Sequence, residues 1–133
     1  MNLAKYRREH LAGIVAICEA EGWPSFPADH ERAHAVLTAP GVTSVVALEG
    51  TEVVGFAYLQ SDGHIQAHLS ELAVRADHRR KGIARALLEY AMPLTGAQRI
   101  DLVTDTADAF YASLPHHTFT GFRIYPGWKP TDA

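Results

Sequence analysis

The residues best suited to binding chemistry form a basic, glycine-containing turn, His78 to Gly82, between an apolar strand-like segment and a helical pattern. The first amides of a helix lack intrahelical partners and lie at the positive end of its dipole. A glycine there lets a ligand approach the backbone closely. These features suit a pyrophosphate group, although a solvated basic helix start would use the same residues. Five of the 12 basic side chains gather here within 11 residues: Arg75, Arg79, Arg80, Lys81 and Arg85.

Two side chains just upstream, His68 and Glu71, could accept a proton from a reacting group. Strict alternation along a strand puts them on opposite faces, and only a bulge between them would bring them to one face. Each residue also has a purely structural interpretation. His68 could be a hydrogen-bonded strand histidine, and Glu71 could be a structural or exposed carboxylate. His64 and His68 would lie about 13 Å apart on a strand, too far to share one ion, so we predict no metal site.

Hydrophobic periodicity outlines the elements that must position these residues. A short strand at 3–6 precedes helical patterns at 8–21 and 27–39. Strands at 42–48, 53–60 and 64–74 follow with short turns and predict an antiparallel meander. Next come a helix at 82–92 stopped by Pro93, a strand at 100–104, a short helix capped by Asp105 or Thr106 and reaching Leu114, and a last strand at 119–125. This order predicts a single α+β domain, residues 1–133, with a mixed sheet.

Composition and charge exclude several classes of function. The 133 residues, 47% hydrophobic and 20% charged, can bury a core without cross-links. Cys18 is the only cysteine, so no internal disulfide forms, and its apolar helical setting indicates a buried side chain rather than a reactive thiol. A net charge of −3 disfavours nucleic-acid binding. Without a signal peptide or an apolar run of about 20 residues, we expect a soluble, cytoplasmic protein with no membrane contact.

The order of residues in the basic turn resembles the acetyl-coenzyme A signature of the GNAT superfamily of N-acyltransferases, Arg/Gln-x-x-Gly-x-Gly/Ala. The six signature residues here are Arg79, Arg80, Lys81, Gly82, Ile83 and Ala84. The apolar Val74 stands five positions before the first of them, as in the family. The family's order of strands and helices is similar to the order predicted above over nearly the whole chain.

This resemblance implies where the co-substrate acetyl-coenzyme A binds. The six signature residues would supply backbone amides to its pyrophosphate. The strand residues whose backbone would pair with its pantetheine arm are Leu72, Ala73 and Val74. The family's central sheet is mostly antiparallel, is flanked by helices and is splayed where the cofactor enters. The resemblance also implies a homodimer.

A second match lies downstream, where Ala107 to Tyr111 resembles the family's Ala-x-x-Phe-Tyr helix. In many members this tyrosine lies near the coenzyme sulfur, and a phenol can protonate the departing thiolate because it is a neutral donor at pH 7. The resemblance therefore makes Tyr111 a candidate general acid, with core packing as the alternative. The family often has asparagine at a cofactor-contacting position where this chain has Thr104. The connection from this helix to Gly121-Phe122 is also longer than usual.

Taken with the candidate bases, the resemblance implies an N-acetyltransferase that moves an acetyl group from acetyl-coenzyme A directly to an amine in a ternary complex. The acceptor would be a small-molecule or peptide amine. Glu71 or His68 would remove a proton and Tyr111 would protonate the thiolate. The alternative is a non-catalytic acyl-coenzyme A-binding module of the same fold, which would keep the turn at Arg79–Ala84 without needing Glu71 or Tyr111.

Overall fold

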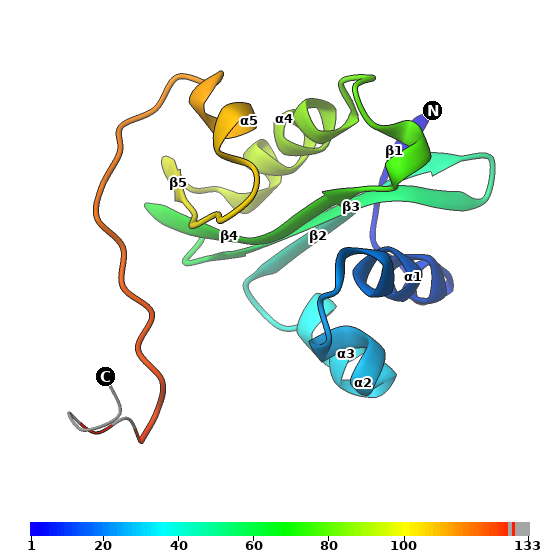
Figure 1. Ribbon diagram of the computed structural model, residues 1–133, viewed down its shortest axis with the longest axis horizontal. Coiled ribbons are helices and arrows are strands. Elements are labelled where there is room, and N and C mark those ends of the chain that lie inside the picture. The colour runs from blue at the N-terminus through cyan, green and yellow to red at the C-terminus, as the bar shows by residue number, and fades with distance from the viewer. Residues whose placement is uncertain (128, 130–133) are drawn as a thin grey trace. The chain divides into compact units, whose positions relative to one another are not determined.

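A computed structural model describes residues 1–127 and 129. Contacts along the chain divide it into two compact units, residues 1–102 and the residues from 103 onward, and each is described by itself. The first unit holds a five-stranded sheet with covering helices (Figure 1). Among its described residues, the second holds one short helix, α5 (Asp108–Ala112), followed by an irregular segment.

The sheet is mixed and mostly antiparallel. Its strands lie side by side in chain order: β1 (Asn2–Lys5), β2 (Val42–Glu49), β3 (Glu52–Ser61), β4 (Gln66–Val74) and β5 (Arg99–Asp101). The first four pair antiparallel, whereas β5 runs parallel to β4 and pairs only with Gln66–His68. No strand among the described residues pairs with the rest of β4 on that side. The sheet is therefore splayed beside Leu69–Val74, which confirms the predicted fold class.

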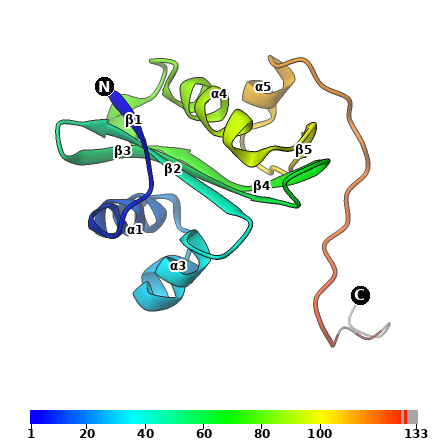
Figure 2. The same ribbon diagram turned by 180° about the vertical axis from the view of Figure 1, so that it is seen from behind.

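Helices cover both faces of the sheet, as the two opposite views show (Figures 1 and 2). One face carries η1 (Arg8–His10), α1 (Leu11–Glu21), α2 (Ser25–Ala28) and α3 (His30–Leu37). The other carries α4 (Ile83–Thr95), whose apolar side is buried as its spacing predicts. The short turn η2 (Ala76–His78) joins β4 to the segment that leads into α4. The core beneath α1 includes Ile14, Cys18, Phe26, Phe56 and Tyr58.

Several element boundaries differ from the prediction because polar side chains take backbone hydrogen bonds. The Asp62 carboxylate accepts the N–H groups of His64, Ile65 and Gln66, so β4 begins at Gln66 rather than at His64. Asp29 caps α3 by accepting the Arg32 N–H at 3.1 Å, and this divides the predicted helix at 27–39 into α2 and α3.

Two other boundary predictions were wrong. Pro93 does not stop α4, which continues to Thr95, because a proline in the last turn removes only one intrahelical bond and Gly96 makes the actual left-handed end. The predicted caps Asp105 and Thr106 do not begin α5. Its N-cap residue is Ala107, whose N–H is accepted by Thr104 Oγ1 at 3.1 Å.

The predicted last strand at 119–125 is absent from the described residues. Its apolar side chains are exposed: Phe119, Phe122, Ile124 and Tyr125. A strand is stable only when its backbone pairs with a neighbour, so β propensity alone does not make one. The predicted strand at 100–104 is similarly reduced to Arg99–Asp101.

Candidate active site

A bulge in β4 brings the two candidate bases to one face of the sheet. Tyr58 of β3 is opposite Glu71, and the next residue, Leu59, is opposite Leu69, so Ser70 is the extra residue in β4. His68 is in turn opposite Gln60, which lies two residues beyond Tyr58. Because alternate residues of β3 share a face, Glu71 and His68 share that face as well.

Glu71 lies half-buried beneath α1, where two donors from different elements reach its carboxylate. The Tyr58 hydroxyl donates to Oε1 at 2.9 Å, and the Cys18 thiol of α1 donates to Oε2 at 3.8 Å. Burial raises the pKa of Glu71, and the bonds from Tyr58 and Cys18 oppose that rise. No cation among the described residues forms an ion pair with this carboxylate. Glu71 is therefore a carboxylate that gains a proton more readily than an exposed one.

The Cys18 side chain is fully buried, as its apolar helical setting predicts. It also contacts the candidate base Glu71, which the sequence did not indicate. Burial raises its pKa to about 12, and the nearby Glu71 adds to the rise. A thiol that stays protonated is not a nucleophile near neutral pH. Cys18 therefore acts only as a donor.

Close helix–sheet packing places Cys18 over Glu71. Gly13 lies one turn and a residue earlier on α1, and a Cβ at Gly13 would come within 2.7 Å of the Val53 Cβ on β3. Any larger residue would push α1 away from the sheet. The glycine thus sets the depth at which Cys18 meets β4.

His68 occupies a different environment on the same strand. Its side chain is exposed, and no hydrogen bond or ion pair joins it to another described residue. Its backbone is opposite Asp101, at the last residue where β4 and β5 pair. His68 thus stands at the point where the sheet splays, and the described contacts do not connect it with Glu71.

The backbone of β4 presents hydrogen-bonding groups on its splayed side. The Arg75 N–H donates to the Val54 carbonyl of β3 at 2.8 Å, and bonds to one neighbour alternate along an antiparallel strand. The N–H and C=O groups of Leu72 and Val74 therefore point away from β3, whereas those of Ala73 point toward it. This edge can pair with an extended ligand as another strand would.

The signature turn has the backbone conformation that a close approach requires. Arg80 and Gly82 both have positive φ, 62° and 78°, and nothing lies within 4 Å of the position a Gly82 Cβ would take. The first intrahelical bond of α4 runs from the Ala86 N–H to the Gly82 carbonyl at 3.0 Å. The amides of Ile83 and Ala84 come before it, at the positive end of a 13-residue helix.

The five clustered cations do not all remain available to an anion. Arg75 is paired with Asp77 at 2.7 Å and with Glu52 at 3.9 Å, and Arg85 is paired with Glu89 at 3.0 Å. Arg79 donates to the Val74 carbonyl at 3.1 Å and forms an ion pair with Glu21 at the end of α1. Arg80 and Lys81 are exposed and have no such partner among the described residues. These two supply the unneutralised positive charge of the turn.

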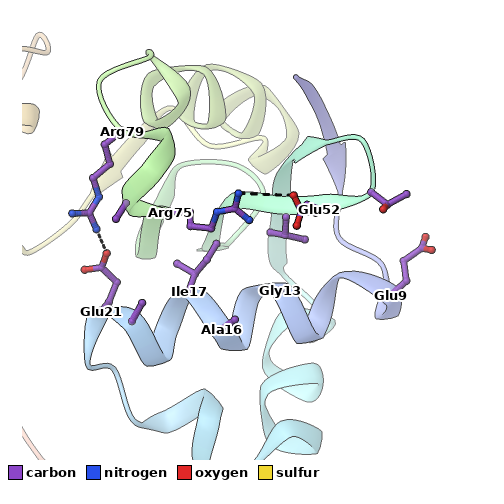
Figure 3. Close-up of a pocket in the computed structure, with 12 residues that line it drawn as sticks. Glu9, Gly13, Ala16, Ile17, Glu21, Glu52, Arg75 and Arg79 are labelled. Atoms are coloured by element: carbon purple, nitrogen blue, oxygen red, sulfur yellow. Dashed lines mark hydrogen bonds and ion pairs between the residues drawn. The ribbon is translucent and has the colours of Figure 1, made fainter.

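A groove of about 610 Å³ separates α1 from the turn (Figure 3). Gly13, Ile17 and Glu21 line it from α1, and the paired arginines Arg75 and Arg79 line it from the opposite side. Glu71 does not line this groove. Helix α1 thus presents Cys18 to the candidate base and a different side to the groove.

Two further candidates, Thr104 and Tyr111, belong to the second unit. The Thr104 hydroxyl accepts the Ala107 N–H in the turn before α5, so its oxygen already has one partner. Tyr111 is half-buried, its ring meets that of Phe110 edge to face at 5.0 Å, and burial raises its pKa. The phenol is therefore protonated at neutral pH.

Sequence reasoning missed Tyr58 and the contact made by Cys18. In the sequence, Tyr58 is one of several apolar residues of a predicted strand. Its hydrogen bond to Glu71 depends on the register of β3 against β4. A bulge shifts that register by one residue and leaves no fixed signature in the sequence. In the part of the chain that the structure describes, no group of three or more His, Cys, Asp or Glu could hold a metal ion. None of the described helices is long and apolar enough to span a membrane.

This arrangement agrees with the comparison of the chain with known families. Residues 40–114, which run from the start of β2 through α5, match the model of the acetyltransferase (GNAT) domain. The match covers more than half of the chain, so the protein belongs to the GNAT acetyltransferase family. No curated protein matches its sequence.

Solved structures share the fold over almost the whole chain. An aminoglycoside acetyltransferase from an uncultured soil metagenomic sample is 23% identical, with a TM-score of 0.73 over 93% of this chain and 97% of that chain. A ribosomal-protein-alanine N-acetyltransferase from Brucella melitensis biovar Abortus 2308 is 16% identical, with a TM-score of 0.73 over 95% and 99%. The aminoglycoside enzyme AAC(6')-Iy, in complex with a coenzyme A-linked bisubstrate analogue, is 17% identical, with a TM-score of 0.70 over 93% and 97%. At these identities the likeness establishes the fold alone.

Proposed function

We propose that the protein is an acetyl-coenzyme A-dependent N-acetyltransferase that transfers the acetyl group directly to an amine. The observation that carries this proposal is the arrangement along β4. A half-buried carboxylate, Glu71, immediately precedes the strand edge at Leu72–Val74, and the edge leads into the open turn at Gly82. A thioester bound along that edge would have its carbonyl near a group that accepts protons.

The residues present fit acetyl-coenzyme A. The outward amides of Leu72 and Val74 suit the pantetheine arm, with Ala73 between them. The signature turn suits the pyrophosphate because Gly82 leaves space and the first amides of α4, including Ile83 and Ala84, are free to donate. Arg80 and Lys81 would add attraction through charge, whereas Arg79 would hold the turn against α1. Thr104 is a weaker candidate because its oxygen already accepts a bond.

In the proposed reaction the amine nitrogen attacks the thioester carbonyl, a C–N bond forms and the C–S bond breaks. Glu71 accepts the proton that the nitrogen loses, directly or through water. Tyr111 donates its proton to the leaving sulfur. Strand amides near Val74 would stabilise the carbonyl oxygen as charge develops on it. No acyl-enzyme is formed, in keeping with the buried and protonated Cys18.

Between the two candidate bases we favour Glu71. Burial raises its pKa toward the range in which a base both accepts and releases protons near neutral pH. His68 stays the alternative, because it lies on the same face at the start of the splay. A cytoplasmic location stays a prediction from the sequence, and a homodimer stays a prediction that the family resemblance implies.

The test is an assay of coenzyme A thiol release with acetyl-coenzyme A and two panels of acceptors, aminoglycosides and peptides with amino-terminal alanine. These panels follow the names of the structural neighbours. We expect turnover with a member of one panel, and a loss on the order of 10² or more in kcat for Glu71→Gln but not for His68→Gln. Binding of coenzyme A without turnover on either panel would contradict the proposed N-acetyltransferase activity. Full activity of Glu71→Gln with loss in His68→Gln would reassign the base.

A further inference from the structure

One pair of side chains around Glu71 has no part in the reaction described above. Tyr58 and Cys18 each donate to a different carboxylate oxygen, from β3 and from α1. The two elements approach Glu71 from separate directions, so the pair restricts rotation of the carboxylate. The inference drawn from this contact deepens the proposed function and rests on it.

Both donors are held in place by packing. The Tyr58 side chain is 7% exposed, and its ring stacks on Phe26 of α2 with ring centroids 5.5 Å apart and an interplanar angle of 23°. Cys18 is fully buried in the same core. Because both side chains are buried and the Tyr58 ring is stacked, little rotational freedom remains to either donor. The direction of both donors is therefore fixed before any substrate binds.

We propose that Tyr58 and Cys18 are positioning residues that fix the Glu71 carboxylate and set how readily it takes a proton from the acceptor amine. Each carboxylate oxygen can accept about two hydrogen bonds, so one lone pair on each stays open after the two donors are satisfied. Those lone pairs share a plane that Tyr58 and Cys18 determine. The acceptor nitrogen, or a water between it and Glu71, is thereby directed to one side of the carboxylate.

The protonation states agree with this role. Burial raises the pKa of Tyr58 and that of Cys18, so both keep their protons and donate throughout the neutral range. The other titratable groups nearby are His68, on the same face of β4, and Glu21, which is on α1 and raises the pKa of Cys18. No described cation pairs with Glu71, so the two neutral donors are what offsets the cost of burying its charge.

The decisive variant is Tyr58→Phe, which keeps the stacked ring and removes only the bond to Oε1. The carboxylate form of Glu71 loses support, so its pKa should rise further and the acid limb of the kcat/KM profile should move to higher pH. We expect kcat/KM to fall on the order of tenfold below the midpoint and less than about threefold on the plateau. The rate profile is measured with acetyl-coenzyme A and the aminoglycoside or alanyl peptide that gives turnover. A ¹³C NMR titration of the Glu71 carboxyl in the free full chain gives a second, independent readout.

Two further variants separate positioning from general damage to the fold. Tyr6→Phe is the matched control, because Tyr6 packs against the same core and its hydroxyl shares a 2.8 Å hydrogen bond with His34 Nδ1. Tyr6 directly follows β1, which lies three strands from β4. Its loss should lower thermal stability without moving the Glu71 titration. Cys18→Ala should move that titration in the same direction as Tyr58→Phe but by less, since its bond is longer.

An unmoved Glu71 titration in a folded Tyr58→Phe variant would overturn the proposal. A moved titration with an unchanged rate profile would overturn it too, because Glu71 would then not control the rate through Tyr58. Failure of the proposed function is recognised differently, as a parental chain without turnover on either panel. In that case the NMR titrations of the three variants still decide whether Tyr58 and Cys18 set the protonation of Glu71.

Discussion

Two physical effects shift the pKa of the Glu71 carboxyl group in opposite directions. Burial under α1 disfavours the charged carboxylate, while the bonds from Tyr58 and Cys18 favour it. Burial is the larger effect, so the pKa lies above its ordinary value. An exposed carboxylate would be a weak base and a fully buried one would stay protonated. The half-buried state gives a base that can both take and release a proton.

The same imbalance predicts how Glu71 affects stability. Because the pKa is raised in the folded chain relative to the unfolded one, the contribution of Glu71 is most favourable below the unfolded pKa and is lost as pH rises through the folded pKa. At pH 7 the folded chain therefore holds a charge that water would stabilise better. Glu71→Gln, which keeps an oxygen acceptor for Tyr58, should raise Tm by about 2 °C at pH 7 and leave it unchanged near pH 3.5 or below.

Thermal unfolding followed by circular dichroism at both pH values checks this prediction. Glu19→Gln is the control, because Glu19 is an exposed carboxylate on α1 with no partner among the described residues. It should leave Tm nearly unchanged at both values. If Glu71→Gln lowers Tm at pH 7, the ionised carboxylate stabilises the fold, and the conclusion that burial makes its charge unfavourable is wrong.

How far the site can be predicted from sequence depends on whether its residues are contiguous. The turn from Arg79 to Ala84 is one local segment, and the open backbone at Gly82 agrees with its predicted structure. The partners of Glu71 come from α1 and β3, and their contact depends on a register set by the bulge at Ser70. No local pattern encodes that register, because it depends on the bulge, which has no fixed sequence signature.

At the scale of elements, the connection from β4 to α4 combines three backbone features within 11 residues. The strand edge at Leu72 and Val74 points outward, Arg80 takes a left-handed conformation, and Gly82 opens the start of α4. The Arg79–Glu21 ion pair then connects this turn to the end of α1. Strand, turn and helix are therefore held as one surface of outward backbone amides, where we propose that the anionic part of the ligand binds.

Gly82→Val tests that surface. Nothing lies within 4 Å of the place that a Cβ at Gly82 would occupy, so valine would not clash within the protein, but it would fill the space that a pyrophosphate needs. We expect coenzyme A affinity to fall at least about tenfold by isothermal titration calorimetry. Gly22→Val is the matched control, since Gly22 also has positive φ, 77°, and open space around it, at the end of α1.

Both valine variants carry the same backbone strain, so they should lose similar stability, and any difference in affinity reports on the turn. Equal affinity for coenzyme A in the two folded variants would show that the ligand does not approach Gly82. A stronger effect at Gly22 would point to the end of α1 as the contact. Either result would remove the signature turn from the binding site.

Elements with a strong apolar stripe were predicted well, and elements that depend on a partner were not. Ile83, Leu87 and Leu88 define α4 by their spacing, and all three are buried. The residues at 119–125 have strand propensity but no partner strand in the described chain, so they stay irregular. Element ends were the other weakness, because single side-chain bonds such as those of Asp62 and Asp29 decide them.

At the scale of the whole molecule, the proposed reaction needs groups from both compact units. The base, the strand edge and the turn lie in residues 1–102, whereas the proposed acid, Tyr111, lies in the second unit. Helix α5 is short, and Tyr111 packs edge to face with Phe110 within it. The role proposed for Tyr111 rests on the family resemblance, so it is tested separately from that of Glu71.

Tyr111→Phe tests whether the second unit takes part in the chemistry. The change keeps the ring and its contact with Phe110, so stability and coenzyme A affinity should barely change. Turnover should fall on the order of 10²-fold, because the leaving sulfur would lack a proton donor. The loss should appear in kcat rather than in KM, and it should shrink for an acyl donor whose thiol is more acidic and leaves without a proton.

Phe110→Leu provides the comparison for this last variant, since it alters the aromatic contact and leaves the Tyr111 hydroxyl in place. A proton-donating role predicts that Phe110→Leu affects stability more than turnover and that its effect does not depend on the leaving thiol. Two measurements distinguish the variants. Steady-state kinetics are compared between acetyl-coenzyme A and the acyl donor with the more acidic thiol, and thermal unfolding reports stability. A folded Tyr111→Phe chain with full turnover would assign Tyr111 to packing, and the proton for the sulfur would then have to come from water or from the protonated base.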